Sequence, residues 1–284
     1  MTIQRFAIHV FAVFALIAIG HSAPPATPAP AAAAPGASTG PSHDRLIIVG
    51  DSTACFYDKG RFAYRGWGMF IQPYLKDSIE VVNEARPGRS VRTYMLEGSW
   101  KNALREKPKF VLIQFGTNDA HDARTKEGVD PEISYPMFLN KYVNATLSAS
   151  AIPILISPAH PRIFDGKGRM VDVLGPFNRA MHDVALKRGV AFVDLYTASG
   201  ELYEKLGEDT SKQFEPMKND HVHFNALGAK AMAELIMRRL VKVEPRIKEF
   251  LAPNPRLLGE GDQQAQSGGT DNGGGGLFDL RVDH

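Results

Sequence analysis

The sequence predicts an α/β fold, a three-layer α/β/α sandwich around a central parallel sheet of about five strands. Short apolar runs rich in β-branched residues alternate along the chain with stretches of helical periodicity. Strands that alternate with helices form parallel sheets covered by helices on both faces. Short polar loops follow the first three runs. In open α/β sheets such loops lie at one edge, where ligands bind.

The apolar runs are the predicted strands. The first, residues 46–49, stops at Gly50 and leads directly into Asp51 and Ser52. A run that is apolar at consecutive positions is typical of a strand buried on both faces. The other predicted strands are residues 79–82, 110–115, 152–156 and 191–193.

Helices are expected between and after these strands. Apolar residues at helical spacing over 69–75 predict a helix packed on the sheet. Residues 83–90 are expected to form a loop that leads into a short helix. Longer helices are predicted over residues 135–149, over 177–188 with Gly189 as C-cap, and over 226–240.

The two ends of the chain differ in composition from its centre. Residues 1–23 are expected to be a signal peptide, because Arg5 precedes an apolar run too short for a full membrane span. A Pro/Ala-rich linker (24–43), the folded domain (44–252) and a disordered Gly-rich tail (253–284) should follow. The Gly-x-Ser-x-Gly match at 36–40 lies in the linker, without the strand and helix that this motif needs. The chain is therefore predicted to be secreted or periplasmic, with no stable membrane insertion after cleavage.

The net charge and the cysteine content argue against two properties, nucleic-acid binding and an intramolecular disulfide. The formal net charge of +2 lacks the basic footprint of nucleic-acid binding, so no nucleic-acid partner is expected. The single cysteine, Cys55, excludes an intramolecular disulfide. A folded part of roughly 200 residues is long enough for one α/β domain with a large core.

Polar residues at the predicted strand ends, and one segment near the end of the domain, could together hydrolyse an ester. Ser52 is the candidate nucleophile. His223 is the candidate base, because histidine can accept a proton at neutral pH. Asp220 could accept a hydrogen bond from the other ring nitrogen and set its tautomer. The backbone N–H groups of Ser52 and Gly88 and the Asn118 side-chain amide are candidate oxyanion donors.

These residues also have purely structural interpretations. Residues 50–52 and 118–119 are of types that favour turns, and Gly88 could serve only the turn after Pro87. Asp220 could be the N-cap of a helix.

A metal site is a further alternative. His221 and His223 form a His-x-His pair, for which Asp119, His121 and Asp122 could supply further ligands. The serine interpretation explains more of the residues, so no metal and no cofactor are expected.

Taken together, the motifs resemble one known superfamily. Gly-Asp-Ser at 50–52, the glycine loop at 88, Gly-x-Asn-Asp at 116–119 and Asp-x-x-His at 220–223 resemble the SGNH (GDSL) hydrolases, in order and spacing, from residue 47 to about 240. The resemblance implies a flavodoxin-like SGNH hydrolase fold. It assigns the nucleophile to Ser52, the catalytic pair to Asp220 and His223, and further oxyanion donors to Gly88 and Asn118.

The similarity is closer to one branch, the rhamnogalacturonan acetylesterases, which remove acetyl groups from pectic polysaccharide. It rests on residues 50–54, 66–68, 83–85, 88–94, 113–116 and 219–224, and on Ser157-Pro158 with Arg162 and Phe164. Thr117 departs from the histidine usual in that branch, which bears on the exact substrate. Arg89 and Arg92 either line the groove, where they could pair with acidic sugars, or form structural ion pairs.

The expected function is that of a serine esterase that removes O-acetyl groups from a carbohydrate, of pectic type. Its expected partner is an acetylated carbohydrate, and the sequence makes no prediction of oligomeric state. One alternative is a lipid or thioester hydrolase on the same scaffold. Another is a non-catalytic carbohydrate-binding or envelope module, against which the complete set of site residues argues.

Overall fold

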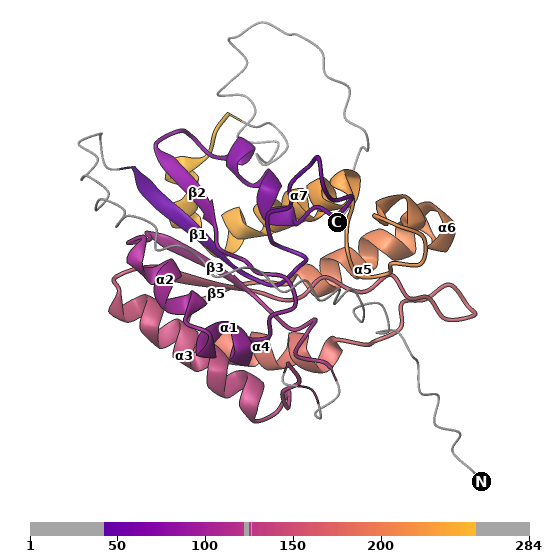
Figure 1. The fold of residues 1–284 in the computed structure, drawn as a ribbon, viewed down its shortest axis with the longest axis horizontal. Coiled ribbons are helices and arrows are strands. Elements are labelled where there is room, and N and C mark those ends of the chain that lie inside the picture. The colour runs from indigo at the N-terminus through magenta and orange to yellow at the C-terminus, as the bar shows by residue number, and fades with distance from the viewer. Residues whose placement is uncertain (1–42, 122–124, 126, 254–284) are drawn as a thin grey trace, which may run out of the picture. The chain divides into compact units, whose positions relative to one another are not determined.

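The computed structural model describes residues 43–121, 125 and 127–253, which contain a parallel sheet of five strands (Figure 1). The predicted signal peptide lies outside the described residues, as do residues 24–42 of the linker and 254–284 of the tail. The strand order is β2-β1-β3-β4-β5. The strands are β1 (Asp44–Gly50), β2 (Ile79–Asn83), β3 (Phe110–Gln114), β4 (Ile152–Ile156) and β5 (Ala191–Val193). The predicted parallel sheet is confirmed.

The strand order places a switch point beside β1. The chain passes from β1 to β2 on one side and then returns to β3 on the other. The register pairs Gly50 at the end of β1 with Gln114 at the end of β3. The loops that follow these two strands therefore diverge from a common edge, which is where ligands bind in doubly wound sheets.

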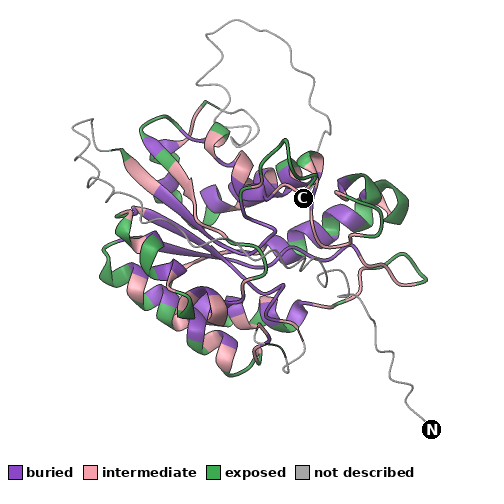
Figure 2. Cartoon of the chain, viewed as in Figure 1, coloured by how far each residue is buried: buried purple, intermediate pink, exposed green. Residues whose placement is uncertain are grey.

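Helices cover both faces of the sheet, because β1 directs alternate side chains into two separate cores (Figure 1). Leu46 and Ile48 face the layer of α5 (Leu195–Leu206) and α7 (Ala226–Val243). Ile47 and Val49 face the opposite layer. That layer contains α1 (Val91–Leu96), α2 (Ser99–Arg105), α3 (Ser134–Ser148) and α4 (Gly175–Arg188). Figure 2 shows the central strands mostly buried and the outer sides of the helices exposed, whereas the edge strand β2 is largely half-buried.

Local sequence signals account for several helix ends. Ser90 and Thr93 form a reciprocal capping box at the start of α1. Gly189 ends α4 in the left-handed conformation, as predicted, with φ of 61°. Asn225 caps α7 by accepting backbone N–H groups of its first turn. Among the described helices, none has the length and apolar character needed to cross a membrane.

The helix prediction differs from the structure in several places, one of which is α2, since only one short helix was expected between β2 and β3. Residues 69–75 do not form one helix but parts of two short 3-10 helices, η1 (Trp67–Phe70) and η2 (Gln72–Tyr74). Pro73 lacks an N–H donor, and the Gln72 side chain bonds to β2 through the Ile79 carbonyl and the Val81 N–H.

Another difference lies after β5, where the sequence analysis placed no element before residue 226. The structure has α5 there, followed by α6 (Glu208–Ser211) and η3 (Lys212–Phe214). Gly200 in the middle of α5 lowers its helix propensity, but the ring of His160 packs so closely that an added Cβ would lie 3.2 Å from Cδ2. Tertiary packing therefore outweighs propensity in α5.

Candidate active site

Ser52 lies in a tight turn directly after β1, at the carboxyl edge of the sheet. The Ala54 N–H donates to the Asp51 carbonyl at 3.2 Å. Asp51 Oδ1 accepts the N–H of Thr53 at 2.9 Å and its hydroxyl at 2.8 Å. Ser52 is only 6% exposed. The turn suggested by the sequence is therefore present, and it holds the serine side chain at the sheet edge.

Neighbouring segments hold this turn in place. Asn83, at the end of β2, donates its side-chain amide to the Ala54 carbonyl at 2.8 Å. The Tyr57 hydroxyl donates to the Ser52 carbonyl at 3.1 Å. Gly66 packs so tightly on the turn that an added Cβ would lie 2.4 Å from the Ala54 carbonyl carbon. Only glycine fits there, which explains the Gly-Trp-Gly motif in terms of backbone packing.

Asp220 and His223 come from an irregular segment between η3 and α7. Asp220 Oδ1 accepts the backbone N–H of Val222 at 3.1 Å and of His223 at 2.9 Å. These bonds close a tight loop that places both side chains on the same side. Asp220 is not a helix N-cap, because Asn225 has that role for α7.

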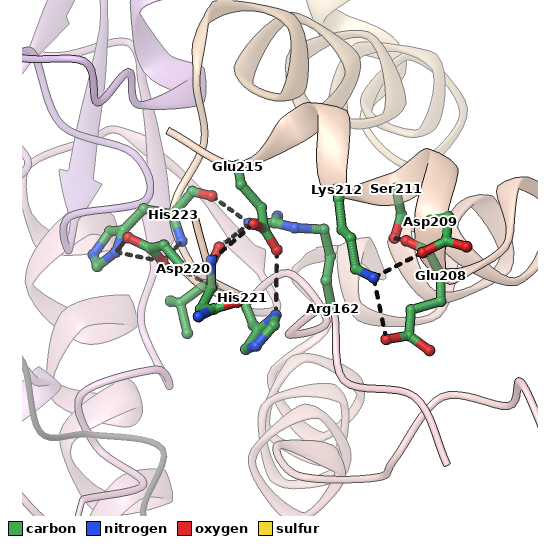
Figure 3. Close-up of polar contacts among 11 residues, drawn as sticks. Arg162, Glu208, Asp209, Ser211, Lys212, Glu215, Asp220, His221 and His223 are labelled. Carbon is green, nitrogen blue, oxygen red and sulfur yellow. Dashed lines mark hydrogen bonds and ion pairs between the residues drawn. The ribbon is translucent and has the colours of Figure 1, made fainter. Parts of the chain in front are cut away.

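The structure brings Ser52, His223 and Asp220 into one hydrogen-bonded series. His223 Nε2 lies 3.0 Å from Ser52 Oγ. His223 Nδ1 lies 3.0 Å from Asp220 Oδ2, and Figure 3 shows this second contact. Burial disfavours the charged carboxylate, yet hydrogen bonds from the His223 side chain and backbone outweigh it and lower the pKa of Asp220 to about 2. An ionised Asp220 can hold the imidazole with Nδ1 protonated, which leaves Nε2 free to accept the serine proton.

The candidate oxyanion donors come from the loops after β2 and β3. Asn118 is buried, and its amide donates to the Arg89 carbonyl at 3.1 Å, which joins the two loops. The Arg86 N–H donates to the Gly50 carbonyl at 3.0 Å, which holds the β2 loop beside Ser52. Gly88 is exposed and adopts a φ of 73°, in the left-handed region that favours glycine.

The buried Asp119 carboxylate is hydrogen-bonded to the backbone near both loops, the one after β2 and the one after β3. Its two oxygens accept the N–H of Val91, at the start of α1, and of Gly116, in the loop after β3, each at 2.9 Å. Asp51 is equally buried, and burial raises the pKa of both carboxyls. Asp119 is therefore a structural tie beneath the candidate oxyanion donors.

Thr117, the departure from the branch pattern, lies inside the protein. It is 5% exposed, and its side chain interacts with Asp51 and opposes the burial effect on the pKa of that carboxyl. Thr117 is therefore part of the interior support of the Ser52 turn.

The histidine pair of the metal alternative is divided between two acids. His221 Nδ1 lies 3.3 Å from Glu215 Oε1, whereas His223 bonds Asp220 (Figure 3). The other ring nitrogen of His223 lies at Ser52 Oγ. Asp119 is occupied by backbone N–H groups. Asp122 lies outside the described residues. Within residues 43–121, 125 and 127–253, no cluster of three or more His, Cys, Asp or Glu side chains has the arrangement of a metal site.

Arg89, in the loop after β2, forms an ion pair with Glu97 at the end of α1. Its Nε lies 2.9 Å from Glu97 Oε2, and its Nη1 donates to the Pro87 carbonyl at 2.9 Å. Of the two interpretations of this arginine, the structural ion pair is the one present.

Several residues around the site have no role in the predictions made from the sequence. Tyr57 bonds to the Ser52 backbone, and the ring of Tyr64 meets the His223 ring edge-on at 5.2 Å. Arg162 entered only as part of a motif, yet it contacts the Asp220–His223 loop. Residues 56–64 are rich in aromatic side chains, and this is the sequence feature that could have pointed to the two tyrosines. Because these aromatic residues follow no periodic pattern, the sequence does not show which of them lie at the site.

Known proteins with similar sequences are esterases by name. The chain is 28% identical over 200 residues to the probable rhamnogalacturonan acetylesterase YesY of Bacillus subtilis, covering 69% of this chain and 91% of that protein. It is 27% identical over 222 residues to the rhamnogalacturonan acetylesterase RhgT of the same organism, covering 73% and 94%.

The fold also matches solved structures. The crystal structure of the B. subtilis protein YXIM aligns with a TM-score of 0.64 at 22% identity, over 71% of this chain and 57% of that chain. Residues 48–231 match the model of the GDSL-like lipase/acylhydrolase family. The matched segment spans more than half of the sequence and contains Ser52, Gly88, Asn118, Asp220 and His223. The chain therefore belongs to the GDSL-like lipase/acylhydrolase family.

Proposed function

We propose that this protein is a serine esterase that removes acetyl groups from a carbohydrate, of the pectic, rhamnogalacturonan type. The observation that carries the proposal is the series Ser52 Oγ–His223 Nε2 and His223 Nδ1–Asp220 Oδ2, with 3.0 Å at each step. Similarity to two proteins named as rhamnogalacturonan acetylesterases supports the substrate class.

In the proposed reaction Ser52 Oγ attacks the acetyl carbonyl carbon while His223 Nε2 accepts the hydroxyl proton. The carbonyl oxygen becomes an oxyanion, which accepts hydrogen bonds from the Ser52 and Gly88 N–H groups and the Asn118 amide. Collapse expels the sugar oxygen, to which His223 returns the proton. Water, deprotonated by His223, then attacks the acetyl-serine, and as the bond to Ser52 Oγ breaks His223 returns that proton to Oγ and acetate is released. Asp220 stays ionised throughout and stabilises the imidazolium.

The leaving group must lie on the His223 side of the site, because His223 protonates it. An aromatic shelf lies there, made of Tyr57, Phe62, Tyr64 and Met217. Tyr64 lies edge-on to His223, its hydroxyl is 3.3 Å from Met217 Sδ, and Tyr57 contacts both Tyr64 and Phe62. Phe62 and Met217 are exposed. Such a surface suits the apolar face of a sugar ring and supports a carbohydrate leaving group.

The proposal is tested by measuring acetate release from acetylated rhamnogalacturonan fragments, acetylated xylan and methyl acetate, beside release of long-chain fatty acid from a lipid ester. We expect the highest kcat/KM on the pectic acetate esters. Phe62→Ala should raise KM for the sugar esters about 3- to 10-fold, the equivalent of about 1 kcal/mol of apolar contact, and leave methyl acetate unchanged. A preference for long acyl chains would instead favour the lipid or thioester hydrolase.

Asn118→Ala is expected to lower kcat on p-nitrophenyl acetate by about 10²- to 10³-fold with little change in KM, because the lost amide acts on the developing oxyanion. Steady-state kinetics checks this. Asn102→Ala in α2, whose side-chain oxygen accepts a hydrogen bond from Arg105, is the matched control and should retain wild-type kcat. An Asn118→Ala enzyme with unchanged kcat would remove Asn118 from the proposed oxyanion site.

We also propose that the chain is exported, on the basis of the charged and apolar pattern of residues 1–23. Pectic polysaccharide is too large to enter a cell intact, so a secreted or periplasmic location suits the proposed substrate.

A further inference from the structure

The Asp220–His223 loop has neither helix nor strand structure of its own, and one arginine bonds much of its backbone. Arg162 Nη2 donates to the Asp220 carbonyl at 2.7 Å and to the His223 carbonyl at 2.5 Å. The backbone N–H of Arg162 donates to the His221 carbonyl at 2.8 Å. Figure 3 shows the Arg162 side chain reaching this loop. His223 is the proposed acceptor of the serine proton, and Asp220 orients its ring. The backbone carbonyls of both residues are thus bonded to one guanidinium group.

The Arg162 guanidinium is buried and lies between the Asp220–His223 loop and two aromatic rings. The residue is 3% exposed, and its guanidinium lies over the rings of Phe224 and Tyr203, 5.3 and 5.8 Å from their centroids. Its Nε and Nη1 are buried without a hydrogen-bond partner in the described part of the chain. A buried charge is costly unless bonded, so the carbonyl bonds and ring faces are what hold Arg162 in the interior.

We propose that Arg162 is a positioning residue, which sets the distance between His223 Nε2 and Ser52 Oγ by holding both ends of the Asp220–His223 loop. This inference rests on the proposed function, because it concerns the same proton transfer. Ser52 is placed by β1 and His223 by a loop distant in sequence. Their 3.0 Å separation therefore depends on tertiary contacts of that loop.

The chemistry of the side chain explains the choice of arginine. One planar guanidinium presents several N–H donors in a fixed geometry and stacks between aromatic faces. The lysine ammonium is more strongly hydrated and lacks the planar group, so it should hold the loop less well. A displacement of about 1 Å in a reacting group can cost about 10² in rate.

The experiment compares Arg162→Met, Arg162→Lys and a stability control by steady-state kinetics and thermal unfolding. Arg162→Met should lower kcat on p-nitrophenyl acetate about 10²-fold with KM within about 3-fold, and Arg162→Lys should lie between, about 10-fold below wild type. The control, Ile247→Ala, removes a buried side chain from η4 (Pro245–Phe250), which packs at the opposite edge of the sheet through Phe250 on Phe110. It should lower the melting temperature but keep kcat within about 2-fold below that temperature.

A purely structural role predicts equal kcat for the folded fractions of Arg162→Met and Ile247→Ala, and that result overturns the proposal. If Arg162→Met does not fold, Arg162→Lys decides alone: full wild-type kcat overturns the proposal, and a 10-fold loss with unchanged KM supports it. If the wild type hydrolyses no ester, the proposed function fails separately. The downfield proton resonance of His223 Nδ1–H then decides: its loss in Arg162→Lys but not in Ile247→Ala supports positioning, and its retention contradicts it.

Discussion

Replacement of Ser52 by alanine is expected to reduce kcat on p-nitrophenyl acetate by about 10⁴-fold or more, because removing the nucleophile disables the whole hydrogen-bonded series. The loss should come without unfolding. The turn that carries Ser52 is closed by Asp51 and Thr53, and alanine leaves those bonds intact. Binding of the substrate should be little affected, so we expect kcat to fall while KM stays nearly unchanged.

Kinetics and mass spectrometry together check this result. A serine-directed phosphonate should label the wild type at Ser52 and fail to label Ser52→Ala. Ser99→Ala in α2, a buried serine whose hydroxyl bonds Glu97, is the matched control and should keep full activity. If Ser52→Ala retains more than a tenth of wild-type activity, the serine mechanism is wrong. If the wild type is neither active nor labelled, the non-catalytic alternative is favoured.

Asp220→Asn is expected to lower kcat by about 10⁴-fold. Asp220 Oδ2 lies 3.0 Å from His223 Nδ1, where a carboxylate favours the tautomer with the proton on Nδ1. An amide nitrogen at that position would donate to Nδ1 instead and leave the proton on Nε2. The imidazole could then no longer accept the Ser52 proton.

The same substitution should alter how stability depends on pH. The pKa of Asp220 is about 2 in the folded protein, against an ordinary value of 3.8. A carboxyl whose pKa is lowered on folding stabilises the protein above its unfolded pKa, and the contribution disappears as the pH falls to the folded pKa. Wild type should therefore exceed Asp220→Asn in free energy of unfolding by roughly 2 kcal/mol near pH 6, with the excess lost between about pH 4 and 2.

Urea unfolding at pH 6, 4 and 2.5 measures this difference. Asp209, an exposed carboxyl on α6, provides the control: Asp209→Asn should show no comparable excess at pH 6. A difference between wild type and Asp220→Asn that stays constant from pH 6 to 2.5 would show that Asp220 is not stabilised in its charged form.

Much of the fold follows from local pattern. The apolar runs that end at Gly50 and Gln114 are buried on both sides, so their composition alone identifies them as inner strands of a parallel sheet. Gly189 and Asn225 mark helix ends through backbone chemistry that needs no tertiary partner. Residues 69–75 were wrongly predicted as one helix because Gln72 bonds β2, a contact invisible in the local sequence.

The sequence by itself determined which strand ends carry polar residues, and hence that Ser52, Gly88 and Asn118 gather at one edge of the sheet. Parallel strands align their carboxyl ends, so chain order is enough for that conclusion. The tertiary structure alone decided how Asp220 and His223 meet Ser52. Their loop has no periodic structure, and its position comes from Arg162, which lies far away in the sequence. Contacts of a buried guanidinium with backbone carbonyls depend on the folded geometry of two distant segments, and side-chain pattern along the chain carries no record of them.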